Sequence, residues 1–444
     1  MLKNQHPIII AEMAAIGAAN TPSPLHRWQG VLHVKSQNIM VNLISAIEFY
    51  RDYQEKYADL ISISFKLDPV VYDRLIQSNK EELEFSISMV PIKTSFIGSS
   101  SSGYYKYERM KAKLYDTKSS QQTMSSELTA TINSTGLPVL RDVSLQLYPK
   151  RLDIIRTTTY GGNHRRANPV SVLRSLIQDF NRKNKAELSG IDIAPNATTQ
   201  VFEQLIVPDN TPFYKVPAVI NTQSGGIYST GFSHYIQRGI WNIFSPYDLS
   251  RYDSPNNGRR KLTVINVPPT SLNGVEKTWR ATDSQIIVMA TGETKQLDVT
   301  EFMQENMGTA ARFADPVAME KATQNIGGVV RTNPKDFLNE FDGGIRKDGT
   351  ARIASGTSIT SRYRLAYGEI AAMLGTIITF FWQNSNPDVL YPGMPVKFIY
   401  FQDGRAIEKR GVLLGSVDRS IPVNRDITQV VHGYTSYLKL FVER

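Results

Sequence analysis

Apolar and polar residues alternate at every second position in several segments of this chain, and this period constrains the fold more than any other sequence feature. In ISISFKL (residues 61–67) the large apolar side chains fall on one side, with serines and a lysine between them. Segments 83–89 and 143–147 repeat the pattern. Such alternation is typical of half-buried strands in antiparallel sheets with one face toward solvent. The sequence therefore predicts a mainly β chain with at least two barrel-like domains.

Further strands are expected in the second half of the chain, where β-branched and aromatic residues gather between turn signals. The turns YPGM (391–394) and QDGR (402–405) separate strands near the C-terminus. The expected strands are KLTVINV (261–267), SQIIVMA (284–290), GTIITFFW (375–382), VKFIYF (396–401), GVLLGSV (411–417) and YLKLFVER (437–444).

The chain has 444 residues, which is too long for one compact core and predicts two to four domains. With 41% hydrophobic and 20% charged residues, its composition is that of a globular protein. Cysteine is absent from the sequence. This excludes a disulfide framework, thiolate metal sites and cysteine nucleophiles, and it fits assembly in a reducing cytosol.

The formal net charge is +9, yet lysine and arginine are scattered along the chain. Small clusters occur, for example at residues 165–166 and 259–261. A sequence-specific DNA reader concentrates its basic residues in a patch. We therefore favour an ordinary surface with a cationic bias over a DNA-reading one.

The N-terminal run PIIIAEMAAIGAA (7–19) resembles a signal peptide, but Glu12 interrupts it and no clean cleavage site follows. We interpret it as an N-terminal arm, with the signal peptide as the open alternative. The longest later apolar run, residues 370–382, is shorter than the ~20 residues that span a bilayer. We therefore expect no membrane-spanning segment.

Three helices are expected. Asp68 can cap a short helix with Pro69 in its first turn. Asn168 and Pro169 begin a longer helix, whose apolar stripe falls within residues 172–180. TTQVFEQLI (198–206) is expected to form the last, with its valine, phenylalanine, leucine and isoleucine on one face.

The stretch GGIYSTGFSHYIQRGIWNIFSPYDLSRYD (225–253) is crowded with aromatic residues. Alternation over 228–236, a turn at Arg238-Gly239 and a strand over 240–244 predict a β-hairpin. Its aromatics could stack bases or sugars, but they fall on both faces of the hairpin. Core packing is the better explanation, so Trp241 and Phe244 should be buried and His234 should satisfy a buried hydrogen bond. Hairpin and helices form an α+β unit inserted in a β-rich chain.

No persuasive catalytic arrangement is found. The six histidines form no metal-binding spacing, and His26 and His33 lie seven residues apart, a poor geometry for a metal. GGNHRR (161–166) precedes the Asn168 cap and could meet a phosphate, but a plain loop is the preferred interpretation. Glu340 and Asp342 could be imagined as a glycosidase pair, without support from spacing. We expect no catalytic, cofactor-binding or metal-ligating residue, no cofactor and no enzymatic activity.

Two stretches carry a resemblance to a known family. Residues 225–253 resemble the middle segment of the central hub proteins of contractile-tailed bacteriophage baseplates, with a Gly-Ile-Tyr strand, a Trp-bearing strand and a Pro-Tyr-Asp turn. VLYPGMPVKFIYFQDGRAIEKRGVLLGSVDRS (389–420) resembles the late barrel strands of such hubs. The architecture of residues 30–444 is similar as well. The segment 301–359 has no counterpart in that family.

The resemblance implies a structural virion protein: a non-enzymatic baseplate hub joining the tail tube to the spike. It implies two tube-type antiparallel barrels per subunit, a homotrimer, and a lumen through which DNA passes transiently. Expected partners are the tube or tube-initiator protein, the central spike protein and the surrounding wedge proteins. The expected location is the tail baseplate of a virion assembled in the host cytoplasm.

Three alternatives stay open. One is another tube-like tail component, such as a tube initiator or distal tail protein. Another is a cell-wall hydrolase in the spike, although metallopeptidase and cysteine-peptidase patterns are missing. The last is a single-stranded nucleic-acid binder that uses the aromatic hairpin.

The fold class expected from these observations is mainly β, with two tube-type antiparallel barrel domains and an inserted helix and hairpin domain. Residues 301–359 are small and polar, without apolar period, which is typical of a surface that orders against a partner. The predicted domains are an N-terminal arm (1–29), first and second barrel segments (30–100 and 101–167), the α+β insertion (168–253), returning barrel strands (254–300), the polar insertion (301–359) and C-terminal barrel strands (360–444).

Overall fold

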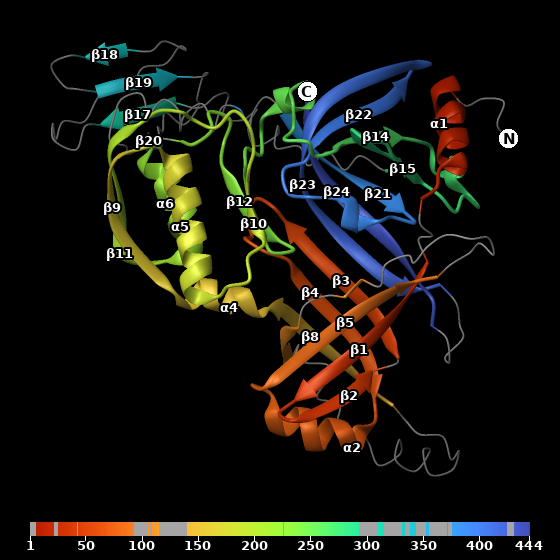
Figure 1. Ribbon diagram of the computed structural model, residues 1–444. Helices are drawn as coiled ribbons and strands as arrows, with labels where there is room; N and C mark the ends of the chain where they lie inside the picture. The colour runs from red at the N-terminus through yellow and green to blue at the C-terminus, as the bar shows by residue number, and fades with distance from the viewer. Residues whose placement is uncertain are drawn as a thin grey trace, which may run out of the picture.

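The protein is described by a computed structural model, which covers most of the chain. The described residues are 6–21, 25–41, 43–92, 105–106, 109–114, 140–224, 226–292, 310–314, 331–333, 338–342, 352–354, 371, 375–423 and 430–444. They form a mainly β fold with few helices, so the predicted fold class is confirmed. Figure 1 shows the N-terminal strands as one body, the C-terminal strands as a second, and the helices of the insertion beside them.

The first barrel is built from the N-terminal strands and closed by two strands from the end of the chain. Around the ring the hydrogen-bonded order is β1, β24, β23, β3, β4, β8, β7, β5 and back to β1. The short strands β2 and β6 pair with β1 and β5 outside this ring. The elements are β1 (His26–Val34), β2 (Gln37–Val41), β3 (Ile44–Asp52), β4 (Leu60–Leu67), β5 (Leu83–Pro91), β6 (Tyr105–Lys106), β7 (Met110–Leu114) and β8 (Arg141–Pro149).

The second barrel uses the strands that follow the insertion. Its order is β16, β14, β22, β23, β24 and β21, with β15 on the outer side of β16. Thr291 and Phe381 close the ring by exchanging two backbone hydrogen bonds of 2.9 and 2.8 Å. Its elements are β14 (Lys261–Asn266), β15 (Trp279–Ala281), β16 (Gln285–Ala290), β21 (Gly375–Gln383), β22 (Pro395–Gln402), β23 (Arg405–Pro422) and β24 (His432–Glu443).

Strands β23 and β24 belong to both barrels, so the two rings form one continuous sheet. The first part of β23 pairs with β22, and residues 415–420 pair with β3. The β23–β24 register shifts between Leu413 and Gly415, where β23 passes from one barrel to the other. A Cβ at Gly415 would lie 2.4 Å from the backbone oxygen of Arg51, so only glycine fits this close approach.

One part of the second barrel differs from the antiparallel expectation. Strand β14 is parallel to both of its neighbours, β16 and β22. The chain leaves β14 and returns through β15 instead of turning back in a hairpin, and this crossover produces a parallel pair. The sequence pattern of single strands carries no information about their partners' direction.

The alternating segments form the strands predicted from them. The runs at 61–67, 83–89 and 143–147 lie in β4, β5 and β8, and their apolar residues fill the core of the first barrel. The expected strands in the second half lie in β14, β16, β21, β22, β23 and β24. Asp68 caps the predicted short helix α2 (Pro69–Val71), with its carboxylate accepting from the Val70 amide at 2.8 Å.

The insertion combines helices with two small sheets. Strands β10, β13 and β12 form one sheet, and β9 and β11 form a two-stranded ribbon on which α5 and α6 lie (Figure 1). It shares one hydrophobic core with the second barrel. The elements are α4 (Lys150–Thr157), β9 (Thr159–Ala167), α5 (Pro169–Asn184), β10 (Gly190–Ile193), β11 (Phe202–Pro212), α6 (Val216–Gln223), β12 (Ser233–Gln237) and β13 (Ile240–Phe244).

The helix predicted from Asn168 is confirmed, and the one predicted over 198–206 is wrong. In α5 the stripe residues Val172, Leu173, Ile177 and Phe180 are buried. Residues 202–206 instead belong to β11, which pairs with β9. Of the predicted helical face, Phe202 and Leu205 are buried, whereas Val201 and Ile206 are exposed. The register with β9 is regular from Phe202 to Val207 and shifts only beyond Val207. Tertiary pairing overrides the local pattern here.

The pairing of β9 with β11 also places α4 and β9 with the insertion, ahead of the boundary predicted at residue 168. The other predicted domain boundaries stay predictions.

The N-terminal run forms helix α1 (Pro7–Ala18), which lies on the outer face of the second barrel beside β14 and β15 (Figure 1). Glu12, which interrupts the apolar run, forms a bidentate pair with Arg280 at 3.0 and 3.1 Å. No helix in the described part of the chain is long and apolar enough to span a membrane.

Most of the predicted polar insertion, residues 301–359, lies outside the described residues, and so does much of the segment 101–139. Four short strands are described there: β17 (Ala310–Ala314), β18 (Arg331–Asn333), β19 (Leu338–Asp342) and β20 (Arg352–Ala354). They pair in the order β18, β19, β17, β20. Glu340 and Asp342 both lie on β19.

Candidate functional site

The histidines are placed as structural residues. His26 and His33 both lie on β1, where His26 contacts the Ser420 hydroxyl at 2.9 Å and His33 contacts Ser86 at 2.8 Å. Within the described ranges, no group of three or more His, Asp or Glu side chains is arranged to hold a metal ion.

GGNHRR is not the predicted loop, because it lies inside strand β9 and pairs with β11. The first amides of α5 are already satisfied, because the Asn168 side chain accepts from Val170 and Ser171 at 3.0 and 3.2 Å. A phosphate at this helix start would have to displace the cap.

The aromatic hairpin is confirmed as part of the core. It forms β12 and β13 around the predicted turn at Arg238-Gly239, and Trp241 and Phe244 are buried. Trp241 packs edge-on against Phe213 with 5.8 Å between ring centroids, and Tyr235 packs likewise against Tyr53 at 4.8 Å. Because these rings fill the interior, the hairpin offers no stacking platform for bases or sugars.

Among the described residues, the prediction that His234 satisfies a buried hydrogen bond is wrong. Its Nδ1 is buried and has no hydrogen-bond partner in the part of the chain that the structure describes, and neither has the Trp241 Nε1. Burial lowers the pKa of His234 to about 4, so the ring is neutral at neutral pH.

A buried charged cluster joins the first barrel, the shared strands and the insertion. Arg51 on β3 donates to Asp418 on β23 at 2.6 Å and to Asp59 at 3.2 Å. Asp59 also accepts from the Tyr235 hydroxyl of β12 at 2.9 Å. The loop between β3 and β4 continues this contact, because the Ile236 amide donates to the Tyr57 carbonyl at 2.8 Å.

The charges of this cluster depend on one another. Burial alone would lower the pKa of Arg51, but Asp59 and Asp418 outweigh it and raise the pKa well above its ordinary value. Burial raises the pKa of Asp418, and Arg51 partly offsets that rise. Removing the arginine would therefore leave Asp418 buried beside no cation. The sequence does not reveal this cluster, because its members are far apart in the chain.

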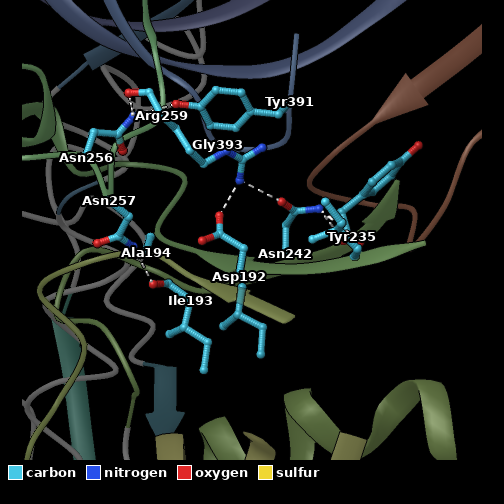
Figure 2. A network of polar contacts seen from close by, with 12 residues as sticks. Asp192, Ile193, Ala194, Tyr235, Asn242, Asn256, Asn257, Arg259, Tyr391 and Gly393 are labelled. Atoms are coloured by element: carbon cyan, nitrogen blue, oxygen red, sulfur yellow. Dashed lines mark hydrogen bonds and ion pairs between the residues drawn. The ribbon is translucent and has the colours of Figure 1, made fainter. Parts of the chain in front are cut away.

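A second polar network holds the insertion against the second barrel. Figure 2 shows Arg259 donating to Asp192 and to Asn242, the latter at 3.1 Å. The guanidinium also lies 3.5 Å from the centroid of the Tyr391 ring, a cation–π contact. Asn256 donates to the Tyr391 hydroxyl at 2.6 Å. The network links β10 and β13 to the YPGM turn before β22.

The two stretches that carry the family resemblance meet in this region. Arg251 donates to the Gly393 carbonyl at 2.5 Å, and Gly393 packs directly on the Phe244 ring. Tyr247 packs against Phe441 of β24 with 4.9 Å between ring centroids. Residues 225–253 and 389–420 therefore pack against each other. Their contacts hold the insertion against both barrels.

The fold defines a class: a protein of two β-barrels that share two strands, with an α+β insertion packed against them. No protein-family model and no curated protein sequence matches the chain.

Solved structures similar to this chain include two tail proteins, one of them from a prophage, and a chain of a VgrG complex. A tail protein from Neisseria meningitidis MC58 is 10% identical with a TM-score of 0.48, over 94% of this chain and 96% of that one. The 43 kDa tail protein of prophage MuSo2 from Shewanella oneidensis is 8% identical with a TM-score of 0.45, over 93% and 98%. The half-lidded Francisella PdpA–VgrG complex is 8% identical with a TM-score of 0.40, over 97% of this chain and 60% of that one.

Proposed function

We propose that this protein is a non-enzymatic structural component of a phage-type tail, and that it serves as the baseplate hub between tail tube and spike. In this role it forms a homotrimer on the tail axis and contacts the tube or its initiator, the spike and the surrounding wedge proteins. Its location is the virion baseplate, after assembly in the host cytoplasm.

The observation that carries the proposal is the pair of closed barrels sharing β23 and β24. The family resemblance of residues 225–253 and 389–420 implies two barrels in each subunit. Two barrels that share strands keep a fixed relative orientation, because neither can rotate without breaking backbone hydrogen bonds of the other. In a trimer, such a pair presents six barrels around the axis, which would match a sixfold tube at one end and a threefold spike at the other.

A non-enzymatic role is supported by how the polar side chains are used. The buried cluster around Arg51 and the network around Arg259 both consist of closed contacts between structural elements. Their groups bind one another and connect structural elements. Rigid attachment is what these contacts can provide.

Copy number and position inside the particle test the proposal. A symmetry-resolved reconstruction of purified tails, combined with quantitative mass spectrometry, should find three copies on the axis between tube and spike. Six copies per ring would make the protein a tube initiator or distal tail component instead. Copies only at the periphery would end the hub proposal.

The spike-hydrolase alternative needs a separate assay. Purified protein should release no fragments from peptidoglycan under conditions in which lysozyme does. Release of fragments that is abolished by a single point substitution would replace the structural role with an enzymatic one.

A further inference from the structure

An unbroken row of apolar side chains crosses the outer face of the shared sheet. Registered pairs connect Leu60 to Tyr50, Tyr50 to Val417, Val417 to Tyr437 and Tyr437 to Phe381. On each strand the residues beside these five are buried, so the row faces outward, and Tyr50, Leu60 and Tyr437 are 37–40% exposed. We call Leu60, Tyr50, Val417, Tyr437 and Phe381 the outer apolar row.

Two ion pairs flank the outer apolar row. On one side Arg419 forms an ion pair with Glu48 at 3.0 Å, and on the other Lys439 pairs with Asp52 at 3.5 Å. Burial raises the pKa of Tyr50, and the carboxylates of Asp52 and of the exposed Glu55 lie near enough to raise it further. The surface therefore combines an apolar centre with an ion pair on either side and one further acidic side chain near Tyr50. A nucleic acid or an anionic membrane would find no free cationic stripe in this row. The matching partner is an uncharged apolar surface.

Helix α1 carries such a surface. Its inward residues Ile9 and Ile16 pack on the second barrel, and its only charged residue, Glu12, is held by Arg280. A surface helix normally has polar residues toward solvent, but here the exposed residues are all uncharged and nonpolar. They are Pro7, Ile8, Ile10, Ala11, Ala14, Gly17 and Ala18, which we call the α1 outer face.

The two surfaces lie on opposite halves of the second barrel. The barrel residues under α1 come from β14, β16 and β22, whereas Val417, Tyr437 and Phe381 of the row come from β23, β24 and β21. In the ring order these are two separate sets of three adjacent strands. One copy therefore cannot cover its own row with its own α1 outer face.

We propose that the α1 outer face of one copy docks on the outer apolar row of a second copy. The lengths match: five strands at ~4.8 Å spacing give a row of about 19 Å, and a 12-residue helix is about 18 Å long. The small residues Ala11, Ala14 and Gly17 allow close approach of the large rings Tyr50, Tyr437 and Phe381. Because the two surfaces differ, the contact is heterologous and builds a ring or an open chain of copies.

This inference goes beyond the proposed trimer by naming the surfaces that join the copies. The inference depends on those two surfaces and not on the position of the protein in a tail. The contact between copies can therefore be absent while the protein is the baseplate hub, and it can be present while the protein is not.

Cross-linking tests the contact directly, because the chain contains no cysteine of its own. Ala14→Cys and Tyr437→Cys are purified separately, mixed at high micromolar concentration and treated with a short bismaleimide. The mixture should give a dimer with one copy of each variant, several-fold above either variant alone. Gln204→Cys, exposed on β11 away from both surfaces, replaces Tyr437→Cys as the matched control. Equal yields with the control would overturn the proposal, as would cross-linking of Tyr437→Cys mainly to itself.

Charge substitution gives a second, independent measurement. Ala14→Glu alone and Tyr437→Lys alone should each weaken self-association in sedimentation velocity by about tenfold or more, since each places an unpaired charge in an apolar contact. A mixture of the two should recover association, because glutamate of one copy then meets lysine of the other. Both sites are exposed, so thermal unfolding should change little. A wild-type protein that stays monomeric at high micromolar concentration, or a mixture without recovery, would overturn the contact.

Discussion

The guanidinium of Arg251 donates to the Gly393 carbonyl at 2.5 Å, across 142 residues of sequence. Arg251 closes the aromatic stretch of the insertion, and Gly393 is the turn glycine that opens β22 of the second barrel. The contact is buried, and the same arginine also donates to Asn256 at 3.1 Å. It is therefore part of what fixes the insertion to the barrel pair.

Replacing Arg251 with methionine should destabilise the protein by about 2–4 kcal/mol, because the Gly393 carbonyl and the Asn256 amide oxygen would lose their donor while buried. Methionine keeps most of the side-chain volume, so lost packing contributes little. Urea unfolding at neutral pH measures the change. Arg419→Met is the control, since its ion pair is exposed and should change stability by less than about 1 kcal/mol. Equal effects at both positions would contradict the importance given to the buried contact.

Gly393→Ala should also destabilise the protein, and for two separable reasons. Gly393 has φ +67°, and an added Cβ would lie 2.2 Å from Cδ2 of Phe244. Gly404→Ala is the matched control: its φ is +72°, but nothing lies within 4 Å of its added Cβ. Gly404→Ala should lower the free energy of unfolding by about 1–2 kcal/mol through backbone strain alone. Gly393→Ala should lower it clearly more, because the clash with Phe244 adds to the same strain. Chemical denaturation of both variants compares them, and a smaller loss at Gly393 than at Gly404 would refute the clash.

The strands were largely predictable from the sequence, and their assembly was not. Alternation of period two at 61–67 places one face of β4 in a core, and this information is local. Nothing local says that β23 pairs with β22 in one half and β3 in the other, or that β14 runs parallel to its neighbours. Likewise residues 202–206 have near-helical spacing, and only their pairing with β9 makes them a strand.

Part of the candidate site was likewise predictable from the sequence, and part was not. Burial of Trp241 and Phe244 followed from aromatics on both faces of a hairpin. The Arg51–Asp418 pair could not be found, because 367 residues separate its members. In the alternation of β3, Arg51 falls on the same side as the buried Ile47 and Phe49, so its charge occupies an inward position. The residue that neutralises it there lies on a distant strand, and nothing local identifies it.

Arg51 and Asp418 should be strongly coupled in a double-mutant cycle. Arg51→Met alone should cost about 3–5 kcal/mol, because it leaves Asp418 buried without its cation. Adding Asp418→Leu should cost less than the sum of the single changes, since the second substitution removes the unpaired charge. The control cycle uses Lys397 and Glu408, an exposed pair at 2.9 Å whose coupling should stay below about 1 kcal/mol. Additive effects at Arg51 and Asp418 would show that Asp59 alone satisfies the arginine.

Stability should also depend on pH through His234 in the aromatic hairpin. Burial lowers its pKa in the folded state to about 4, whereas an unfolded histidine has a pKa of about 6.5. Between these values the unfolded chain binds the additional proton. The stability that His234 contributes is therefore fully present above pH ~6.5 and is lost as pH falls toward ~4, by about 3 kcal/mol in total.

His234→Phe should flatten this dependence, because the substituted side chain cannot take up a proton. The pKa of His432 is also lowered by burial, so a residual slope of the same sign should remain in the variant. Urea unfolding at a series of pH values between 7 and 4 measures both slopes, and the comparison uses the slope and not the absolute stability, which the new ring will shift. An unchanged slope in His234→Phe would mean that other groups carry the pH dependence and that the ring accepts its proton without cost in the folded protein.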